Sequence, residues 1–170
     1  MCAEIARKGK SVEVRRCERN DLREIQEILE AAPEAAMWSE AALAETLERD
    51  PSHFLVAEQD EEIAGFIVGR EIEKEAEILN LAVKPEYRWR RIGQSLVQAM
   101  LEVFAGAGVV RVFLEVRESN QGGIAFYSRL GFRKVGRREH YYHEPEEGAL
   151  VLEVKIGAGN VQAVTNGPVL

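Results

Sequence analysis

Two side chains in one short segment have the types needed to move protons during group transfer, Glu115 and Tyr127, and Asn120 lies between them. Glu115 interrupts an otherwise apolar run at 112–116, where a carboxylate is costly to bury unless it is paired or used. Tyr127 follows Asn120 by seven residues, which places both on one face of a helix. A phenol with a pKa of about 10 stays protonated at neutral pH and can protonate a leaving group. These types predict a general base and a general acid.

Both residues also have ordinary structural interpretations. A glutamate near the end of a strand often lies on a solvated face. A tyrosine at the edge of a core is common in globular proteins. The residues alone leave both interpretations open.

A basic turn before a helix is the second chemical feature. The turn at 88–93 reads Arg-Trp-Arg-Arg-Ile-Gly. The first amides of a helix have no intrahelical acceptor, and the helix dipole favours negative charge there. Arg88, Arg90 and Arg91 add positive charge, and Gly93 lets the backbone come close to a phosphate. The pattern predicts an anion site, with a solvated basic turn as the alternative.

Hydrophobic periodicity and turn residues place these side chains on regular elements. Helices are predicted from Asn20 or Asp21 to near Pro33, from Ser39 to about Arg49, at 93–104, and from Ser119 or Asn120 to near Leu130. Strands are predicted at 12–17, 54–59, 63–73, 78–83, 110–116, 132–142 and 149–156. Asp60-Glu61-Glu62 is expected to turn one hairpin, and Gly131 to end the last helix.

The order of these elements predicts the fold class. A strand–helix–strand unit at 78–116 among other strands indicates an α/β fold with a mixed sheet. A chain of 170 residues is normally one domain, which we expect to span residues 12–156. Residues 1–11 and 157–170 show no periodicity and are expected to be flexible tails.

The composition argues against several classes of function. The formal net charge of −7 disfavours nucleic acid as the main partner; it suits a positively charged peptide, with plain solubility as the favoured alternative. No apolar run is long enough to span a membrane, and the basic N-terminal residues lack the apolar segment of a signal peptide, so a cytoplasmic protein is expected. Cys2 and Cys17 predict neither a disulfide framework nor a metal site. The three histidines have no spacing typical of a hydrolase triad or a metal centre, so no metal is expected.

The pieces between Asn80 and Phe132 together resemble a known family. Leu-Ala-Val before the basic turn, Leu-Glu-Val-Arg at 114–117, Asn120 and Ala-Phe-Tyr at 125–127 follow one another as in the acetyl-CoA-binding half of the GNAT superfamily of N-acetyltransferases. The resemblance is greatest to the branch that acetylates the N-terminal alanine of a ribosomal protein. It covers roughly residues 12–156 and implies a mixed, mostly antiparallel sheet of about seven strands flanked by about four helices.

The resemblance implies acetyl-CoA as the co-substrate. In the family, a strand matching Leu81, Ala82 and Val83 binds the pantetheine arm through its main chain, as strand addition would. The residue matching Asn120 contacts the same arm. The phosphate-binding turn matches Arg88, Trp89, Arg90, Arg91, Ile92, Gly93, Gln94 and Ser95.

Arg91 departs from the family pattern. It stands where the first glycine of the phosphate-binding turn is expected. An L-residue there is expected to strain the backbone, and its Cβ to crowd the pyrophosphate, although its guanidinium could instead pair with phosphate. We expect acetyl-CoA binding that is retained but weakened.

The resemblance also implies catalytic and acceptor-binding roles. Glu115 matches the base that deprotonates the acceptor, and Tyr127 matches the acid that faces the CoA sulfur. Trp38, Tyr141 and Tyr142 match side chains of the acceptor groove, with core packing as an equal alternative for Trp38. Adjacent strand residues point to opposite faces, so one tyrosine is expected to order the acceptor while the other packs.

The leading hypothesis is therefore direct transfer of acetyl to the N-terminal α-amine of a protein, a ribosomal protein in the related branch. A monomer or a homodimer would serve this activity. One alternative is acetylation of a lysine or a small amine on the same fold. Another is a non-catalytic acyl-CoA-binding protein, which the replacement of a glycine by Arg91 motivates.

Overall fold

The computed structural model describes residues 11–49 and 52–157. Within them the chain forms seven strands, four α-helices and two short 3₁₀ helices. In chain order these are β1 (Glu13–Arg16), η1 (Arg19–Asp21), α1 (Leu22–Glu30), α2 (Glu40–Glu48), β2 (Ser52–Gln59), β3 (Glu62–Ile72), β4 (Glu75–Val83), η2 (Pro85–Tyr87), α3 (Ile92–Gly106), β5 (Arg111–Arg117), α4 (Gln121–Arg129), β6 (Arg133–His143) and β7 (Glu146–Lys155). The expected tails at 1–11 and 157–170 lie outside the described residues, apart from residues 11 and 157.

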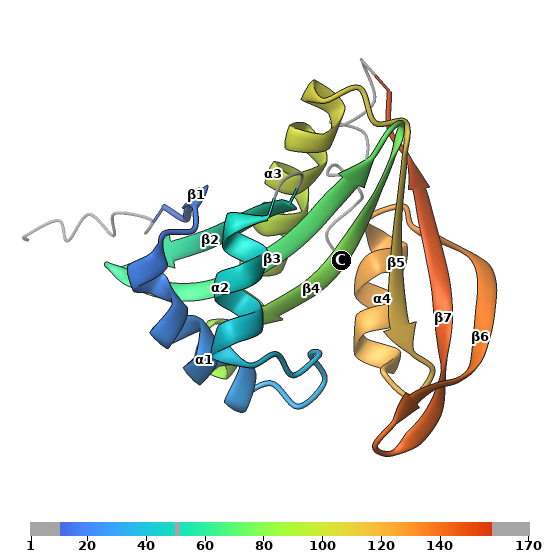
Figure 1. Cartoon of the computed structure of the whole chain (residues 1–170), viewed down its shortest axis with the longest axis horizontal. Helices are drawn as coiled ribbons and strands as arrows, with labels where there is room; N and C mark the ends of the chain where they lie inside the picture. Colours follow the sequence, from blue (N-terminus) through green and yellow to red (C-terminus); the bar gives the residue numbers. More distant parts are fainter. Residues whose placement is uncertain (1–10, 50–51, 158–170) are drawn as a thin grey trace, which may run out of the picture.

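One seven-stranded sheet carries the fold, in the order β1-β2-β3-β4-β5-β7-β6. Neighbouring strands are antiparallel except β4 and β5, which are parallel and connected through α3. The prediction of a mixed, mostly antiparallel sheet with four helices is confirmed. The parallel pairing joins only Glu75–Ile78 to Arg111–Leu114. Beyond it the two strands separate, and Figure 1 shows the sheet opening into two arms. One arm consists of β1, β2, β3 and β4, and the other of β5, β7 and β6.

Two apolar clusters cover the two faces of the sheet. On one face, α1 and α2 pack on β2 and β3. On the other, α3 and α4 pack on strands of both arms. One apolar stripe of α3 is fully buried there: Leu96, Val97, Met100, Leu101 and Phe104. This second cluster holds the two arms together on the side away from α1 and α2.

Capping residues fix the N-termini of two helices as the sequence indicates. The Ser39 hydroxyl accepts a hydrogen bond from the Ala42 amide at 3.2 Å. Asn120 Oδ1 accepts one from the Gly123 amide at 2.8 Å. These bonds satisfy amides that the first turn leaves without an intrahelical partner.

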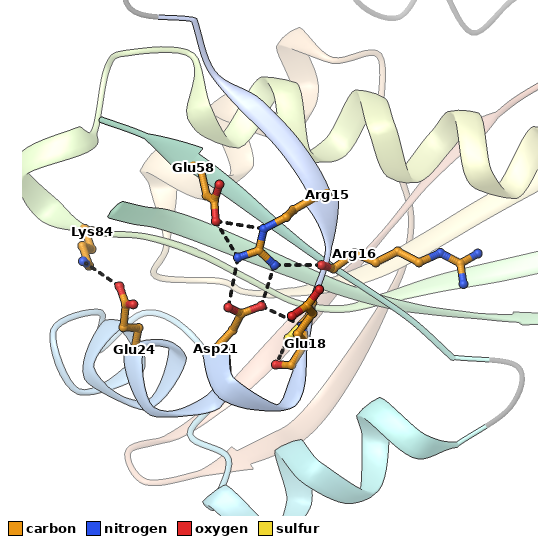
Figure 2. A network of polar contacts seen from close by, with 8 residues as sticks. Arg15, Arg16, Glu18, Asp21, Glu24, Glu58 and Lys84 are labelled. Carbon is orange, nitrogen blue, oxygen red and sulfur yellow. Dashed lines mark hydrogen bonds and ion pairs between the residues drawn. The ribbon is translucent and has the colours of Figure 1, made fainter. Parts of the chain in front are cut away.

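Asp21 is the N-cap residue of α1, one of the two expected from the sequence, but its side chain makes no cap bond to the helix. Its carboxylate instead accepts from Arg15 Nη1 at 2.7 Å, from Arg15 Nη2 at 3.0 Å and from the Glu18 amide at 2.7 Å. Figure 2 shows the Arg15 guanidinium between Asp21 and Glu58 of β2, to which Nε donates at 2.8 Å. This network fastens the four-residue edge strand β1 to η1 and β2.

Candidate active site

A small cavity lies where β4 and β5 separate. Its volume is about 80 Å³, and its lining residues are Glu77, Ile78 and Leu79 of β4, Glu115 of β5, and Tyr141 and Tyr142 of β6. Two candidate acceptor-binding residues and the candidate base, predicted from distant parts of the sequence, therefore meet at one place.

A bulge in β4 marks the same point. Val68 of β3 pairs with Asn80, whereas the next residue, Gly69, pairs with Ile78, so Leu79 is an extra residue in β4. A bulge bends a strand and increases its twist. Past the bulge, β4 continues beside β3, while its described register with β5 has ended. The bulge thus accompanies the separation of the two arms.

Glu115 is nearly buried and paired. Its side chain is 11% exposed, and its Oε1 lies 2.5 Å from Arg138 Nε. The Tyr141 hydroxyl donates a hydrogen bond to the same carboxylate, and this bond, with burial, raises the pKa of Tyr141 to about 12. Glu115 alternates along β5 with buried apolar residues, so it faces away from the main core. The solvated strand-end interpretation of Glu115 is therefore wrong.

The two tyrosines lie together rather than on opposite faces of the strand. Their ring centroids are 5.0 Å apart, in an edge-to-face arrangement at 89°. The expected alternation fails because the register of β6 with β7 shifts between Arg138 and Tyr142, where His140 has a φ of 50°. Tyr142 also packs under the Arg117 guanidinium, 4.0 Å from its ring centroid.

Tyr127 lies on α4 and adjoins this group through Tyr142. Its ring contacts Phe126 and Phe132 edge-on, at centroid distances of 5.0 Å and 5.6 Å. Burial raises the pKa of Tyr127, and the neighbouring Tyr142 adds to the rise. A phenol with a raised pKa remains protonated at neutral pH, as a proton donor must.

Two other candidate residues have clear packing roles. The Asn120 oxygen is committed to the α4 cap, and a Cβ on Gly123 would lie only 2.7 Å from Asn120 Nδ2, so a side chain at 123 would displace the capping amide. Trp38 is partly buried against the cluster beneath α1 and α2. For Trp38, the packing alternative is supported. Leu79, which lines the cavity, packs against the same cluster.

The backbone of the basic turn is left-handed at two positions. Trp89 and Arg91 both have a φ of 65°. Arg91 is the N-cap of α3 without a side-chain cap bond, and the Ser95 amide donates to its carbonyl at 2.9 Å. An L-residue in this conformation costs about 1–2 kcal/mol. The chain thus adopts the glycine-like turn despite Arg91.

The side chains of the basic turn have separate surroundings. Arg88 forms an ion pair with Glu34 of the α1–α2 connection, and the Arg90 guanidinium lies 5.3 Å from the ring centroid of Tyr87. Trp89 is 92% exposed. A Cβ on Gly93 would lie 3.3 Å from Phe126 Cζ, so this glycine also lets α3 approach α4.

Leu81, Ala82 and Val83 form the last part of β4 and pair with β3. Ala82 is buried, and Leu81 and Val83 are half-buried against the apolar cluster under α3 and α4. Because the β4–β5 register has ended before them, their main chain lies at the opened edge expected for strand addition.

Glu77 and Arg138 also belong to this site, although the sequence does not single them out. A nearly buried carboxylate at 115 demands a cation, and the arginine pair at 137–138 was a visible source. Which arginine reaches Glu115 depends on the register of β6, which has two irregularities. No pattern within β6 alone indicates them.

The described residues, 11–49 and 52–157, contain neither a candidate metal site nor a helix that could span a membrane. There, no group of three or more His, Cys, Asp and Glu side chains is placed to hold a metal ion. No helix in that part of the chain is long and apolar enough to cross a membrane.

Comparison with known proteins gives consistent matches. Residues 20–132 match the acetyltransferase (GNAT) family. A [ribosomal protein bS18]-alanine N-acetyltransferase of Escherichia coli (strain K12) is 30% identical over 130 residues, covering 75% of this chain and 87% of that protein. The crystal structure of the ribosomal-protein-S18-alanine N-acetyltransferase from Escherichia coli superposes with a TM-score of 0.77 at 27% identity, covering 88% of this chain and 96% of the other. Arabidopsis thaliana NAA60, solved in complex with acetyl-CoA, has the same fold, with a TM-score of 0.76 at 20% identity, over 86% and 99% of the two chains.

Proposed function

Because this chain belongs to the acetyltransferase (GNAT) family, we propose that it acetylates the N-terminal α-amine of a protein with acetyl-CoA. The observation that carries the proposal is the cavity at the β4–β5 opening, where Glu115 meets Tyr141 and Tyr142. The similarity to bS18-alanine N-acetyltransferases supports a ribosomal protein as the acceptor.

The opened sheet suits the co-substrate. We propose that the pantetheine arm runs along the main chain of Leu81, Ala82 and Val83, as an added strand. The amides at the start of α3, including those of Ile92 and Gly93, would receive the pyrophosphate together with the helix dipole. Bound acetyl-CoA supplies the thioester carbon that accepts the amine.

Glu115 acts in this proposal on the acceptor ammonium. It accepts one proton, which frees the amine lone pair, and later releases that proton to solvent. The amine nitrogen forms a bond to the thioester carbon as the C–S bond breaks. Tyr127 protonates the departing thiolate, and the second proton lost by the nitrogen restores the phenol. The products are an acetylated N-terminus and CoA.

Mass spectrometry of a peptide pair tests the proposal. One peptide has a free N-terminal alanine and no lysine, and its partner has a blocked N-terminus and one lysine. Incubation with protein and acetyl-CoA should add acetyl only to the first. Acetylation of the lysine peptide alone would favour the lysine or small-amine alternative. Acetyl-CoA binding without transfer to any amine would favour the non-catalytic alternative.

The same assay should assign the two catalytic residues. Glu115→Gln and Tyr127→Phe should each lower kcat by about 10²- to 10⁴-fold, the usual contribution of general acid–base catalysis. Calorimetry should show nearly unchanged acetyl-CoA affinity for both variants. Glu118→Gln is the control, because Glu118 pairs with Arg137 and lies outside the cavity lining. An unchanged kcat in either catalytic variant would remove that residue from the mechanism.

A further inference from the structure

We propose that Arg138 occupies in the free protein the place that the acceptor ammonium takes on binding, so that the two cations compete for Glu115. The inference rests on the proposed function, since it names how the same site recognises its acceptor. It predicts that the site selects a cationic amine and disfavours the neutral acetylated product.

The ion pair joins a sheltered anion to an accessible cation. The Glu115 side chain is 11% exposed, whereas that of Arg138 is 59% exposed. A carboxylate removed from water is strongly destabilised unless a cation or hydrogen-bond donors accompany it. Glu115 therefore requires a cation both before and after the acceptor arrives.

Arg138 can withdraw at little cost. Its guanidinium projects from β6, whose residues are mostly exposed. The Tyr141 ring lies nearby, with its centroid 5.7 Å from the Arg138 guanidinium carbon, so cation–π attraction can hold the guanidinium at the rim. The Tyr141 hydroxyl meanwhile remains a donor to Glu115.

The cavity beside Glu115 is small, so an ammonium that enters it lies close to the carboxylate. Its volume is about 80 Å³, which suits an amine and its first carbon atoms. An ammonium carries three donors and one positive charge, so it can replace the guanidinium bond to Glu115. Bringing both cations to one carboxylate would add repulsion between like charges.

The other charged groups around the cavity are already committed. Glu77 accepts from Arg70 at 2.9 Å. Arg117 lies over Tyr142, pairs with Glu147 at 3.3 Å and donates to the main-chain carbonyls of residues 144 and 145. Arg138 is thus the cation that can exchange with an incoming ammonium.

The reaction itself would allow Arg138 to pair with Glu115 again. Acetylation converts the ammonium into a neutral amide, which has no charge to offer Glu115. Once Glu115 has released its proton, Arg138 regains the carboxylate. The competition therefore favours entry of the substrate and departure of the product.

Calorimetry can separate charge competition from other effects. Protein saturated with CoA is titrated with an alanine-terminated peptide and with its N-acetylated form. Arg138→Ala should tighten binding of the free-amine peptide by about twofold to fivefold, the range expected for a partly exposed ion pair. The acetylated peptide should bind the variant and the wild type equally. Arg137→Ala should change neither affinity, because Arg137 pairs with Glu118 and Glu139.

Other results would overturn the inference. Weaker or unchanged binding of the free-amine peptide would mean that Arg138 does not compete for Glu115. Equal tightening of both peptides would indicate a more open groove rather than exchange of charge. Arg138→Lys should retain wild-type affinities, and Arg138→Gln replaces the alanine variant if circular dichroism shows that the latter is unfolded. Binding is measured without turnover, so failure of wild-type acetyl transfer refutes the proposed activity separately.

Discussion

Arg91 shows how one residue can oppose the conformation that its turn requires. Its φ of 65° and ψ of 10° lie in the left-handed region, which glycine adopts without penalty. Trp89 adopts the same φ two residues earlier. The helix nevertheless begins at Ile92, so packing of α3 into the core outweighs the local strain.

Arg91→Gly should therefore stabilise the protein and tighten acetyl-CoA binding. Removing the left-handed L-residue should raise the free energy of unfolding by about 1 kcal/mol. Glycine also makes the unfolded chain more flexible, which offsets part of this gain. Removing the Cβ also gives the pyrophosphate more room. Urea denaturation measures the first effect and calorimetric titration the second.

Arg91→Ala separates the backbone from the charge. Alanine keeps the Cβ and its strain but removes the guanidinium, so it should give neither improvement. If glycine and alanine weaken acetyl-CoA binding equally, the guanidinium contributes to binding and our expectation for Arg91 is wrong.

Single residues also mark the limit of prediction from sequence. Glu115 could be proposed because an acid within an apolar strand is conspicuous, and the structure places it at the opening with a cation partner. Arg138 could not, because its neighbour Arg137 has the same chemistry. The choice between them depends on strand pairing, which brings residues distant in sequence together.

At the scale of elements, the sequence pattern predicted, to within a few residues, the seven strands and four α-helices found in the described part of the chain. The irregularities escaped prediction: the extra Leu79 in β4 and the register shift before Tyr142 in β6. Both depend on the partner strand rather than on local composition. The first lies at the cavity, and the second lies beside the two tyrosines, whose rings are in contact.

The attachment of β1 gives a prediction about pH. Burial alone would raise the pKa of Asp21, but hydrogen bonds from Arg15 and from the Glu18 amide outweigh burial and lower it below its ordinary value. A lowered folded-state pKa means that the ionised group stabilises the fold. This contribution to stability should be complete at pH 7. It should shrink as the pH falls below the ordinary pKa that Asp21 has in the unfolded chain, and vanish below the lowered pKa of the folded state.

Asp21→Asn should accordingly lower the free energy of unfolding by about 1–3 kcal/mol at pH 7, since it weakens charge-assisted bonds in a sheltered network. The difference from wild type should narrow progressively in urea titrations at lower pH. Glu48→Gln is the control, because its ion pair with Arg19 is well exposed and should contribute little. A difference that is constant with pH would exclude ionisation of Asp21 as the cause.

At the scale of the whole molecule, the sheet consists of two arms joined by a short parallel pairing. Only Glu75–Ile78 and Arg111–Leu114 connect β4 and β5, while the α3–α4 face supplies a continuous apolar cluster across both arms. A ligand that enters the opening contacts both arms in the folded state. Unfolding separates those contacts, so such a ligand stabilises the entire chain by mass action.

Acetyl-CoA at 100 times its Kd should therefore stabilise the fold by about 2.7 kcal/mol. For a chain of this size, that corresponds to a rise in Tm of roughly 5–10 °C, which a thermal scan would detect. Acetyl-pantetheine and 3′,5′-ADP represent the two halves of the ligand. Acetyl-pantetheine can reach only the opened edge of β4, whereas 3′,5′-ADP can reach only the basic turn. Each half should stabilise the protein, but less than the whole. Stabilisation by 3′,5′-ADP alone, with none from acetyl-pantetheine at saturating concentration, would mean that the opening between the arms is not the acetyl-binding site.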